Sequence, residues 1–399
     1  MQEKVYLIYR NFKGLVTSIV FLMFRVFPIK KNKIVFCNLE GKGGYGCNPK
    51  YIAEELILRL KEDGNFKLFW IADDLTKTFP KEINVTSNKF FSRVYHLCTA
   101  EIWIDNSRKH LGTLKRKNQI YIQTWHGAIG FKPVGKLRKG EFPHIAYKVS
   151  KNDSKMINYF LSNSEWCTSI CENGFLYSGN VIKTGSPRCD ILINRKKDQY
   201  EKIRDKYQLP TNAKIVMYAP TFRGGSQKAL RKVSMKNVNI DFKTLISTLE
   251  EGNNEEWFVF IRLHPQIKDC FKEYNVGEHC EKVIDVTLED DMYELLAGVD
   301  TLITDYSSVG FDASFMKLPV FIYADDLEKY SLERGELLWD LDSLPFPVST
   351  SNEELINNIK TYNQKKYEER LSGFFEQVGL LEDGNASKRV VNLIERLTK

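Results

Sequence analysis

The stretch IYIQTWHG (residues 120–127) is a short apolar run that ends at a histidine and a glycine. FVFIRLHP (residues 258–265) repeats the arrangement in the second half of the chain, with a proline after the histidine. Each run has the length and the β-rich composition of a buried parallel strand, and glycine or proline ends it. The carboxyl ends of such strands border the ligand crevice of an open α/β sheet. The sequence therefore predicts that His126 and His264 face a ligand site. The alternative is that a backbone carbonyl satisfies each ring.

The composition favours two folded domains and an anionic partner. A chain of 399 residues with 43% hydrophobic residues is long enough for two cores. The net charge of +7 suits an anionic substrate or membrane surface. Because no basic run is interleaved with aromatic residues, we expect no nucleic-acid partner. The eight cysteines are scattered without zinc-like spacing, which indicates reduced thiols. The acid pairs Asp73-Asp74 and Asp325-Asp326 are interpreted as helix-start or solvated residues, so no metal is predicted.

Residues 1–33 are predicted to be an amphipathic segment that associates with a membrane. The apolar run from Leu15 to Phe24 is about half as long as a bilayer-spanning helix. Apolar residues from Val5 to Val26 recur every three or four positions, with basic and polar residues on the other face. Such a helix suits a membrane interface. The alternative is a helix that packs its apolar face against its own domain.

Strand-like runs alternate with helical patterns along the rest of the chain. This alternation predicts an α/β fold of two doubly wound Rossmann-like domains facing across a cleft, after the N-terminal amphipathic helix. The first domain is expected over residues 34–195 and the second over residues 196–399, with a connection in 191–213. Asn48 is expected as a helix N-cap before Pro49. The glycine-rich segment 41–46 before it is only a weak dinucleotide signature.

The densest cluster of polar groups is DTLITDYSSVGFD (residues 300–312), where a short strand precedes a helix start. Hydroxyl groups and free backbone N–H groups at such a place can bind a pyrophosphate. The alternative is an ordinary serine cap without a ligand. Arginines at equivalent strand ends could add cations for phosphate oxygens, because the guanidinium is a planar fork. They are Arg188, Arg223 and Arg262.

Several short motifs occur in a fixed order: NPKYI (48–52), TWHG (124–127), TGSPRCD (184–190), YAPTFR (218–223), RLHP (262–265), DMYELL (291–296), LITDYSSVGFD (302–312) and Arg334-Gly335. In this ordered set the chain resembles the bacterial CDP-glycerol glycerophosphotransferases of teichoic acid and capsule synthesis, over residues 34–340. In length it is similar to the short members, such as the primase that adds the first glycerol phosphate. The resemblance implies a GT-B-like arrangement of two Rossmann-like domains.

The resemblance also implies roles for single residues. His126 would be the general base, and His264 would stabilise the phosphates of the donor. The donor phosphates are expected at Arg223, Arg262, Thr304, Asp305, Ser307, Ser308 and Arg334. The acceptor side or the cleft is expected at Asn48, Gly127 and Arg188. No metal and no cofactor beyond the donor substrate is expected.

The function expected from this pattern is the transfer of glycerol phosphate from CDP-glycerol to a hydroxyl group, with release of CMP. The acceptor would be a lipid-linked saccharide or a polyol-phosphate polymer, at the cytoplasmic face of the cell membrane. One alternative is transfer from CDP-ribitol, since the motifs are shared. A second is a GT-B glycosyltransferase, which would release a nucleoside diphosphate. A third is a binding protein that regulates without turnover. The sequence indicates no oligomeric state.

Overall fold

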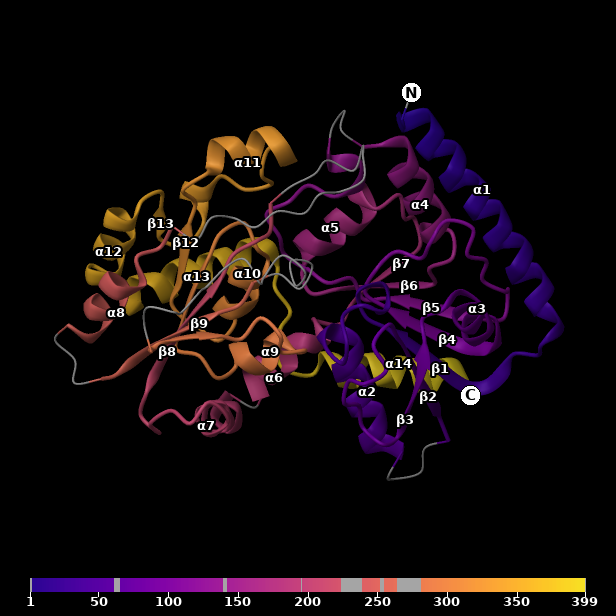
Figure 1. Ribbon diagram of the computed structural model, residues 1–399, viewed down its shortest axis with the longest axis horizontal. Helices are drawn as coiled ribbons and strands as arrows, with labels where there is room; N and C mark the ends of the chain where they lie inside the picture. The colour runs from indigo at the N-terminus through magenta and orange to yellow at the C-terminus, as the bar shows by residue number, and fades with distance from the viewer. Residues whose placement is uncertain are drawn as a thin grey trace. The chain divides into compact units, whose positions relative to one another are not determined.

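The computed structural model describes residues 2–60, 65–138, 142–194, 196–223, 239–251, 255–263 and 281–398 (Figure 1). Contacts divide the chain into two compact units. The first unit contains residues 1–128, 134–190 and 381–399, and the second contains residues 129–133 and 191–380. Each unit is built on one parallel sheet, so the predicted α/β class with two doubly wound sheets is confirmed.

The sheet of the first unit has seven strands in the order β3-β2-β1-β4-β5-β6-β7. All its pairs are parallel. The strands are β1 (Lys30–Cys37), β2 (Lys67–Ala72), β3 (Ile83–Ser87), β4 (Ala100–Asp105), β5 (Ile120–Gln123), β6 (Tyr159–Ser162) and β7 (Asn180–Lys183). Residues near the carboxyl ends of β1, β4 and β5 are almost all buried. That edge is where the predicted strand-end residues of this unit come together.

Six α-helices belong to the described part of the first unit. They are α1 (Gln2–Met23), α2 (Cys47–Leu60), α3 (Phe90–Thr99), α4 (His144–Ser154), α5 (Glu165–Gly174) and α14 (Ala386–Thr398). The helix expected to follow Asn48 as its cap begins one residue earlier, at Cys47. The N-cap prediction for Asn48 is therefore wrong, because its side chain turns to another segment of the unit.

The sheet of the second unit has six strands in the order β10-β9-β8-β11-β12-β13, again parallel throughout. The strands are β8 (Lys214–Ala219), β9 (Trp257–Ile261), β10 (Val283–Asp285), β11 (Thr301–Thr304), β12 (Val320–Tyr323) and β13 (Val348–Ser349). The described helices between residues 190 and 378 are α6 (Asp190–Asn194), α7 (Lys196–Lys206), α8 (Phe242–Glu250), α9 (Met292–Leu296), α10 (Val309–Ser314), α11 (Leu327–Arg334), α12 (Asn352–Lys360) and α13 (Gln364–Val378). The segment expected as the connection between the domains, 191–213, contains most of α6 and all of α7.

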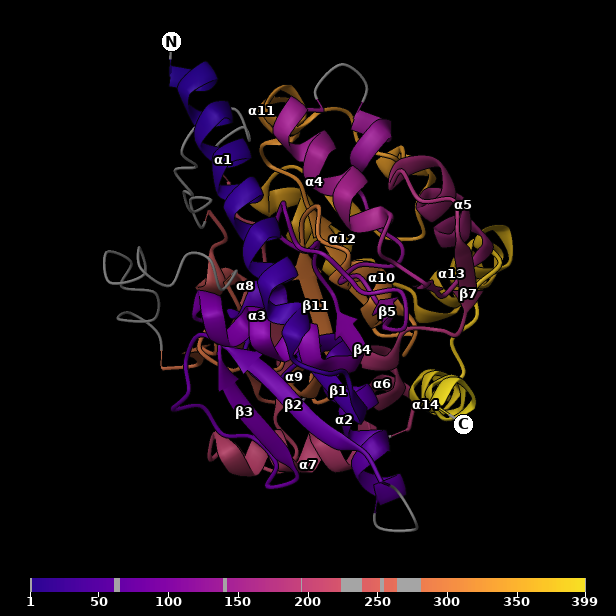
Figure 2. The same ribbon diagram turned by 90° about the vertical axis from the view of Figure 1, so that its right-hand side faces the viewer.

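The C-terminal helix α14 packs on the first unit, although the sequence assigns residues 196–399 to one second domain (Figures 1 and 2). Its apolar face, with Val390, Val391 and Ile394, joins the core cluster that contains Ile52 of α2. The carboxylate of Asp190 accepts hydrogen bonds from the first backbone N–H groups of α14, at 2.9 and 2.7 Å. Helix α14 packs where its apolar stripe is buried, which is against the first unit. The position of the helix in the sequence does not reveal against which unit it packs.

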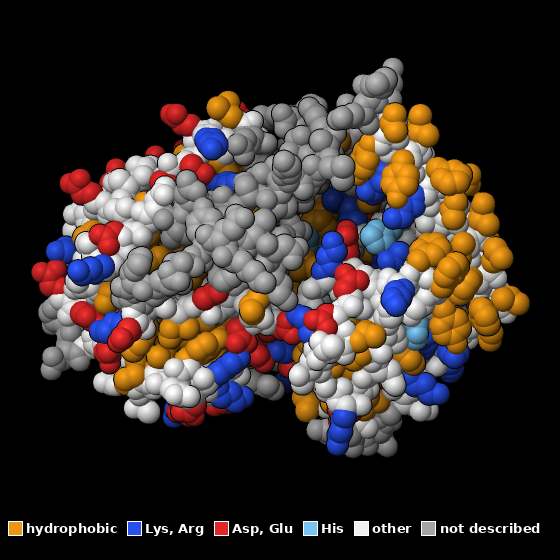
Figure 3. Space-filling model, viewed as in Figure 1, with side chains coloured by type: hydrophobic (Ala, Val, Ile, Leu, Met, Phe, Trp, Pro, Cys, Tyr) orange, Lys and Arg blue, Asp and Glu red, His pale blue; other side chains and the backbone are white. Residues whose placement is uncertain are grey.

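Helix α1 packs on the first unit through a narrow stripe of small, polar and aromatic residues, and its wider apolar face is exposed (Figure 3, right edge). Thr17 and Phe21 on the inner side are 5% and 1% exposed. Ile8, Phe12 and Met23 on the outer side are 69%, 65% and 67% exposed. The alternative of a helix that buries its apolar face on its own domain is therefore wrong. Residues Val5–Val26 also form a helix long and apolar enough to cross a membrane by length and composition.

Candidate functional site

His126 lies three residues after β5, in a loop with an unusual backbone. Trp125 has a φ of 52°, a left-handed conformation that is uncommon for a large side chain. The side-chain oxygen of Gln123 accepts a hydrogen bond from the Trp125 backbone N–H at 2.9 Å. Gln123 is itself fixed by donating to the Tyr121 hydroxyl at 2.7 Å. These bonds hold the turn that carries the His126 side chain to the surface of the unit, where it is exposed.

The imidazole of His126 is oriented by a backbone carbonyl. Its Nδ1 lies 2.7 Å from the carbonyl oxygen of Asn106, and its ring stacks on Trp125 with centroids 4.4 Å apart. A carbonyl oxygen can only accept, so Nδ1 carries the hydrogen. The neutral ring then has its lone pair on Nε2, as a general base requires. The alternative given from the sequence was that a backbone carbonyl satisfies the ring. The Asn106 carbonyl does bind the ring of His126, but the His126 side chain remains exposed.

Asn106 is held in turn by the first loop of the unit. Its side-chain oxygen accepts a hydrogen bond from the Leu39 backbone N–H at 2.8 Å. Its side-chain amide donates to the Asn38 side-chain oxygen at 2.7 Å. Asn106 and Gln123 were not among the predicted site residues. Both are neutral residues at strand ends, and strand-end position is the signal that could have found them.

Asn48 and Arg188 hold the backbone of the His126 loop. The buried Asn48 amide donates to the carbonyls of Thr124 and Trp125 at 3.3 and 2.9 Å. Its oxygen accepts a hydrogen bond from the Arg188 backbone N–H at 3.0 Å. The guanidinium of Arg188 donates to the His126 carbonyl oxygen. Two of the predicted acceptor-side residues, Asn48 and Arg188, therefore contact the main chain of residues 124–126.

In the second unit, Ser307 and Ser308 present partly exposed hydroxyls where β11 leads into α10. Ser308 stands at the N-cap of α10, yet its side chain makes no cap hydrogen bond. The serine-cap alternative is therefore wrong for Ser308. Thr304 and Asp305, from the same predicted group, are both 0% exposed. The Thr304 hydroxyl donates to the Ala219 carbonyl at 2.7 Å.

Arg223 is the centre of a buried ionic cluster. Its guanidinium binds both oxygens of Asp326, at 2.7 and 2.9 Å, and Asp305 at 2.9 Å. Its remaining Nη1 donates to the carbonyl and the hydroxyl of Thr221, both at 2.8 Å. Burial alone would lower the pKa of Arg223, but the carboxylates of Asp326 and Asp305 raise it above the usual range. An arginine has five N–H groups, and these contacts use all five.

This cluster changes the role expected for Arg223, which was a contact to donor phosphate. In the structure its N–H groups bind protein atoms, and the ring of Tyr330 lies 4.8 Å below the guanidinium. Asp326 stands at the start of α11, as the sequence suggested, and its carboxylate also forms an ion pair with Arg223. A buried guanidinium without a counter-ion would lower the stability of the fold, and here Asp305 and Asp326 are its counter-ions. Arg223 therefore holds residues 221–223, which follow β8, against Asp305 and Asp326.

Arg262 is also buried, and it binds carbonyl oxygens. Its guanidinium donates to Val286 at 2.8 Å and to Thr287. Burial lowers the pKa of Arg262. Through these bonds it joins the ends of β9 and β10. His264 and the side chain of Arg334 lie outside the described residues, and Gly127 lies in the loop beside His126.

We predict that replacing Asn48 destabilises the first unit in a graded way. Asn48→Ala removes two donors and leaves buried carbonyls unsatisfied, so unfolding should become easier by about 1–3 kcal/mol. Asn48→Asp should be worse, because a carboxylate would face the same two carbonyls without a hydrogen to donate. Denaturant unfolding checks both, with exposed Asn173→Ala as the control. Equal stability of Asn48→Asp and the parent would contradict the role.

The chain matches one family model, CDP-glycerol:poly(glycerophosphate) glycerophosphotransferase, over residues 19–396. It is 29% identical over 399 residues to the teichoic acid poly(glycerol phosphate) polymerase of Bacillus spizizenii, covering 98% of this chain and 99% of that protein. It is also 29% identical over 379 residues to the teichoic acid poly(ribitol-phosphate) polymerase of the same organism, covering 93% of this chain and 57% of that protein. This glycerol phosphate polymerase matches along 99% of its length. The length of this chain therefore does not distinguish a primase from a polymerase.

The fold matches a solved structure of the same kind. The wall teichoic acid polymerase TagF, solved as a histidine-to-asparagine variant soaked with CDPG, superposes with a TM-score of 0.80 at 26% identity. The match covers 99% of this chain and 98% of that chain. It confirms the GT-B-like class expected from the sequence. With a family model that spans almost all of its residues, this chain belongs to the CDP-glycerol:poly(glycerophosphate) glycerophosphotransferase family.

Proposed function

We propose that this protein transfers glycerol phosphate from CDP-glycerol to a hydroxyl group of a lipid-linked or polymeric acceptor, and that CMP leaves. The observation that carries the proposal is the orientation of His126, whose Nδ1 is tied to a backbone carbonyl. Nε2 takes the proton of the acceptor hydroxyl, and the resulting oxygen attacks the β-phosphorus. The bond between that phosphorus and the bridging oxygen breaks, and its electrons leave with CMP. The family supports this reaction class.

On the donor side, the proposal assigns the phosphates to the second unit. Ser307 and Ser308 are the hydroxyls that remain partly exposed there. Charge that develops on the leaving phosphate is stabilised by preplaced donors, which usually dominate phosphoryl transfer. His264 is proposed as a further donor, as the resemblance implies. Arg223 is proposed as a positioning residue that does not itself contact the donor, since it binds Thr221 and Asp305.

CDP-ribitol is the second candidate donor, because a ribitol-phosphate polymerase is among the relatives. The two donors differ in the length of the polyol. Mass spectrometry of the products formed from each donor with a lipid-linked disaccharide distinguishes them. Release of a nucleoside diphosphate from a sugar donor would instead favour a glycosyltransferase. The proposal includes no metal, since it assigns the negative charge of the donor phosphates to Ser307, Ser308 and His264.

Membrane association through α1 is part of the proposal. The exposed face of α1 is apolar, whereas its packed face carries Gly14, Thr17, Ser18 and the buried Phe21. We favour a helix that lies in the membrane plane over one that crosses it. A crossing helix would have to leave its contacts, among them the bond from the Ser18 hydroxyl to the Gly112 carbonyl at 3.0 Å. Such a helix would hold the enzyme at the cytoplasmic face of the membrane, where a lipid-linked acceptor is found.

The first test of the mechanism is His126→Ala. Turnover with CDP-glycerol should fall by roughly 10²–10⁴-fold, the usual effect of a lost general base. The affinity for CDP-glycerol and the melting temperature should change little, because the ring is exposed. Asn173→Ala serves as a surface control. Near-parent turnover in His126→Ala would exclude this residue as the base.

The donor site is tested by changing Ser307 and Ser308 together to Ala. Hydrogen bonds to a charged phosphate contribute about 1.5–3 kcal/mol, so the affinity for CMP and CDP-glycerol should fall by at least about tenfold. Titration calorimetry of the full chain measures this, with exposed Ser372→Ala as the control. An unchanged dissociation constant in the double variant would remove these hydroxyls from the donor site.

The membrane role is tested by Phe12→Glu with Met23→Glu, which leaves the packed face of α1 intact. Two charges on the apolar face should abolish co-sedimentation with anionic liposomes while the melting temperature and the turnover of a short soluble acceptor stay near the parent values. The matched control is Leu288→Glu with Leu332→Glu, exposed leucines 65% and 85% accessible in the second unit. If both double variants bind liposomes equally well, α1 is not the anchor.

A further inference from the structure

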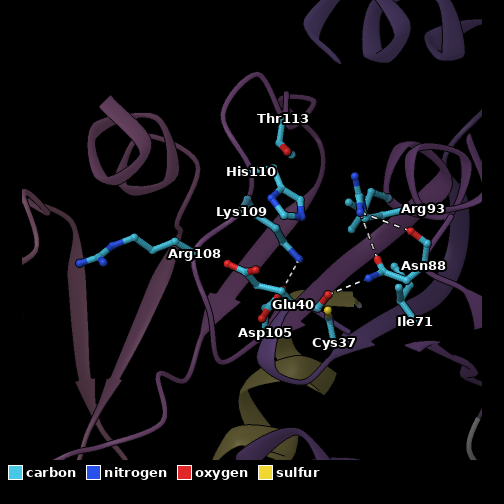
Figure 4. A pocket seen from close by; sticks show the side chains of 11 residues that line it. Cys37, Glu40, Ile71, Asn88, Arg93, Asp105, Arg108, Lys109, His110 and Thr113 are labelled. Carbon is cyan, nitrogen blue, oxygen red and sulfur yellow. Dashed lines mark hydrogen bonds and ion pairs between the residues drawn. The ribbon is translucent and has the colours of Figure 1, made fainter. Parts of the chain in front are cut away.

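Arg108 lies in the loop that follows β4, and the proposed reaction does not use it. The next residue, Lys109, forms a buried ion pair with Asp105 at 2.5 Å. Figure 4 shows the Arg108 side chain pointing away from both of them. Its Nη2 atom is buried and has no hydrogen-bond partner in the described part of the chain. A charged donor that is buried without an acceptor is unfavourable, so its presence requires an explanation.

Two aromatic rings hold the guanidinium of Arg108 in the neighbourhood of His126. Its central carbon, Cζ, lies 5.0 Å from the centroid of the Trp125 ring and 5.2 Å from that of Phe175. The Trp125 ring also contacts the His126 ring, with centroids 4.4 Å apart. Aromatic rings attract a cation but offer no oxygen acceptor to its N–H groups. Arg108 is therefore held beside the ring that contacts the proposed base, with a donor left for a ligand.

The charge of Arg108 is neutralised only in part by the protein. Burial lowers the pKa of Arg108 to about 10, and the charge of Arg138 adds to this effect, while the carboxylate of Asp153 acts in the opposite direction. Burial also raises the pKa of Asp153 to about 7, so this acid carries only part of its charge at neutral pH. Its Oδ1 already accepts hydrogen bonds from the Lys109 backbone N–H at 2.9 Å and the Tyr121 hydroxyl at 3.2 Å. An anionic ligand would complete the neutralisation of Arg108.

We propose that Arg108 binds a phosphate group of the acceptor, and that it favours acceptors that already end in a polyol phosphate. In such an acceptor the reacting hydroxyl and the nearest phosphodiester belong to one polyol unit, so the base and the cation that bind them must be neighbours. His126 and Arg108 contact the same Trp125 ring. The planar N–H groups of arginine match phosphate oxygens. This inference rests on the proposed function, because it places the acceptor hydroxyl at His126.

The competing explanation is that Arg108 only supports Trp125 in its left-handed backbone conformation. The two explanations predict different effects of Arg108→Gln. If Arg108 only supports the loop, the melting temperature falls and every acceptor is used less well, to the same extent. If it binds phosphate, the loss is greatest for an acceptor that carries a phosphate. The melting temperature then stays near the parent value, because the charge that is removed is a buried one that the protein neutralises only in part.

The kinetic test compares two soluble acceptors in the full chain: a disaccharide, and the same disaccharide carrying one glycerol phosphate. In Arg108→Gln the ratio of kcat/KM for the second acceptor to that for the first should fall about tenfold, as expected for one lost hydrogen bond to a charged group. Arg108→Lys keeps the charge and should recover part of the ratio. The control Lys89→Gln removes an exposed charge at the N-cap of α3 and should keep the parent ratio. An unchanged ratio in Arg108→Gln, or an equal loss with both acceptors, overturns the proposal.

A binding measurement separates this inference from the proposed reaction. Glycerophosphoglycerol, a phosphodiester of two glycerols, is titrated into the full chain by calorimetry without CDP-glycerol. Its dissociation constant should be about tenfold higher in Arg108→Gln than in the parent, and unchanged in Lys89→Gln. Equal dissociation constants in Arg108→Gln and the parent, or no binding by the parent, overturn the phosphate site. If the parent binds this phosphodiester through Arg108 but does not turn over CDP-glycerol, the proposed function fails while the phosphate site at Arg108 remains.

Discussion

The buried amide of Asn48 joins three segments of the first unit that are far apart in the sequence. It donates to two carbonyls of the loop after β5 and accepts from the backbone at Arg188. These bonds add to those of Gln123 in holding a loop in which Trp125 has a strained left-handed backbone. Because the backbone is held on one side, the carbonyl of Asn106 can fix the His126 ring on the other. The chemistry proposed for the unit depends on this set of neutral hydrogen bonds.

Charge is handled differently in the two units. In the second unit the fold neutralises Arg223 with Asp305 and Asp326, because a buried guanidinium without carboxylates is unfavourable. In the first unit, the guanidinium of Arg93 donates hydrogen bonds to the carbonyl and side-chain oxygens of Asn88, and its pKa is lowered by burial although the carboxylates of Asp73 and Glu40 act in the opposite direction. Strand-end position alone does not reveal which protein groups an arginine contacts, because those groups come from segments distant in the sequence.

In helix α1, too, the sequence pattern predicts the element but not the surface against which it packs. The sequence predicted an amphipathic helix from its three- and four-residue periodicity, and the helix is present. Periodicity gives two faces but does not say which of them meets the protein. The close contact of Gly14 with Gly112 places the face with Gly14, Thr17 and Phe21 against the unit, because only glycines allow the two backbones to approach. The apolar face is left for another surface, which a membrane would supply.

The sequence by itself determined the α/β class, most strands of both sheets and the place of His126 at a strand end, because these follow from local runs of apolar and β-branched residues. It also determined the family, through an ordered set of short motifs. Only the tertiary structure decided that α14 packs on the first unit and that Asn48 supports a loop instead of capping a helix. The tertiary structure likewise turned Arg223 inward to two carboxylates. Each of these depends on a contact between residues distant in the chain, and local patterns carry no information about such partners.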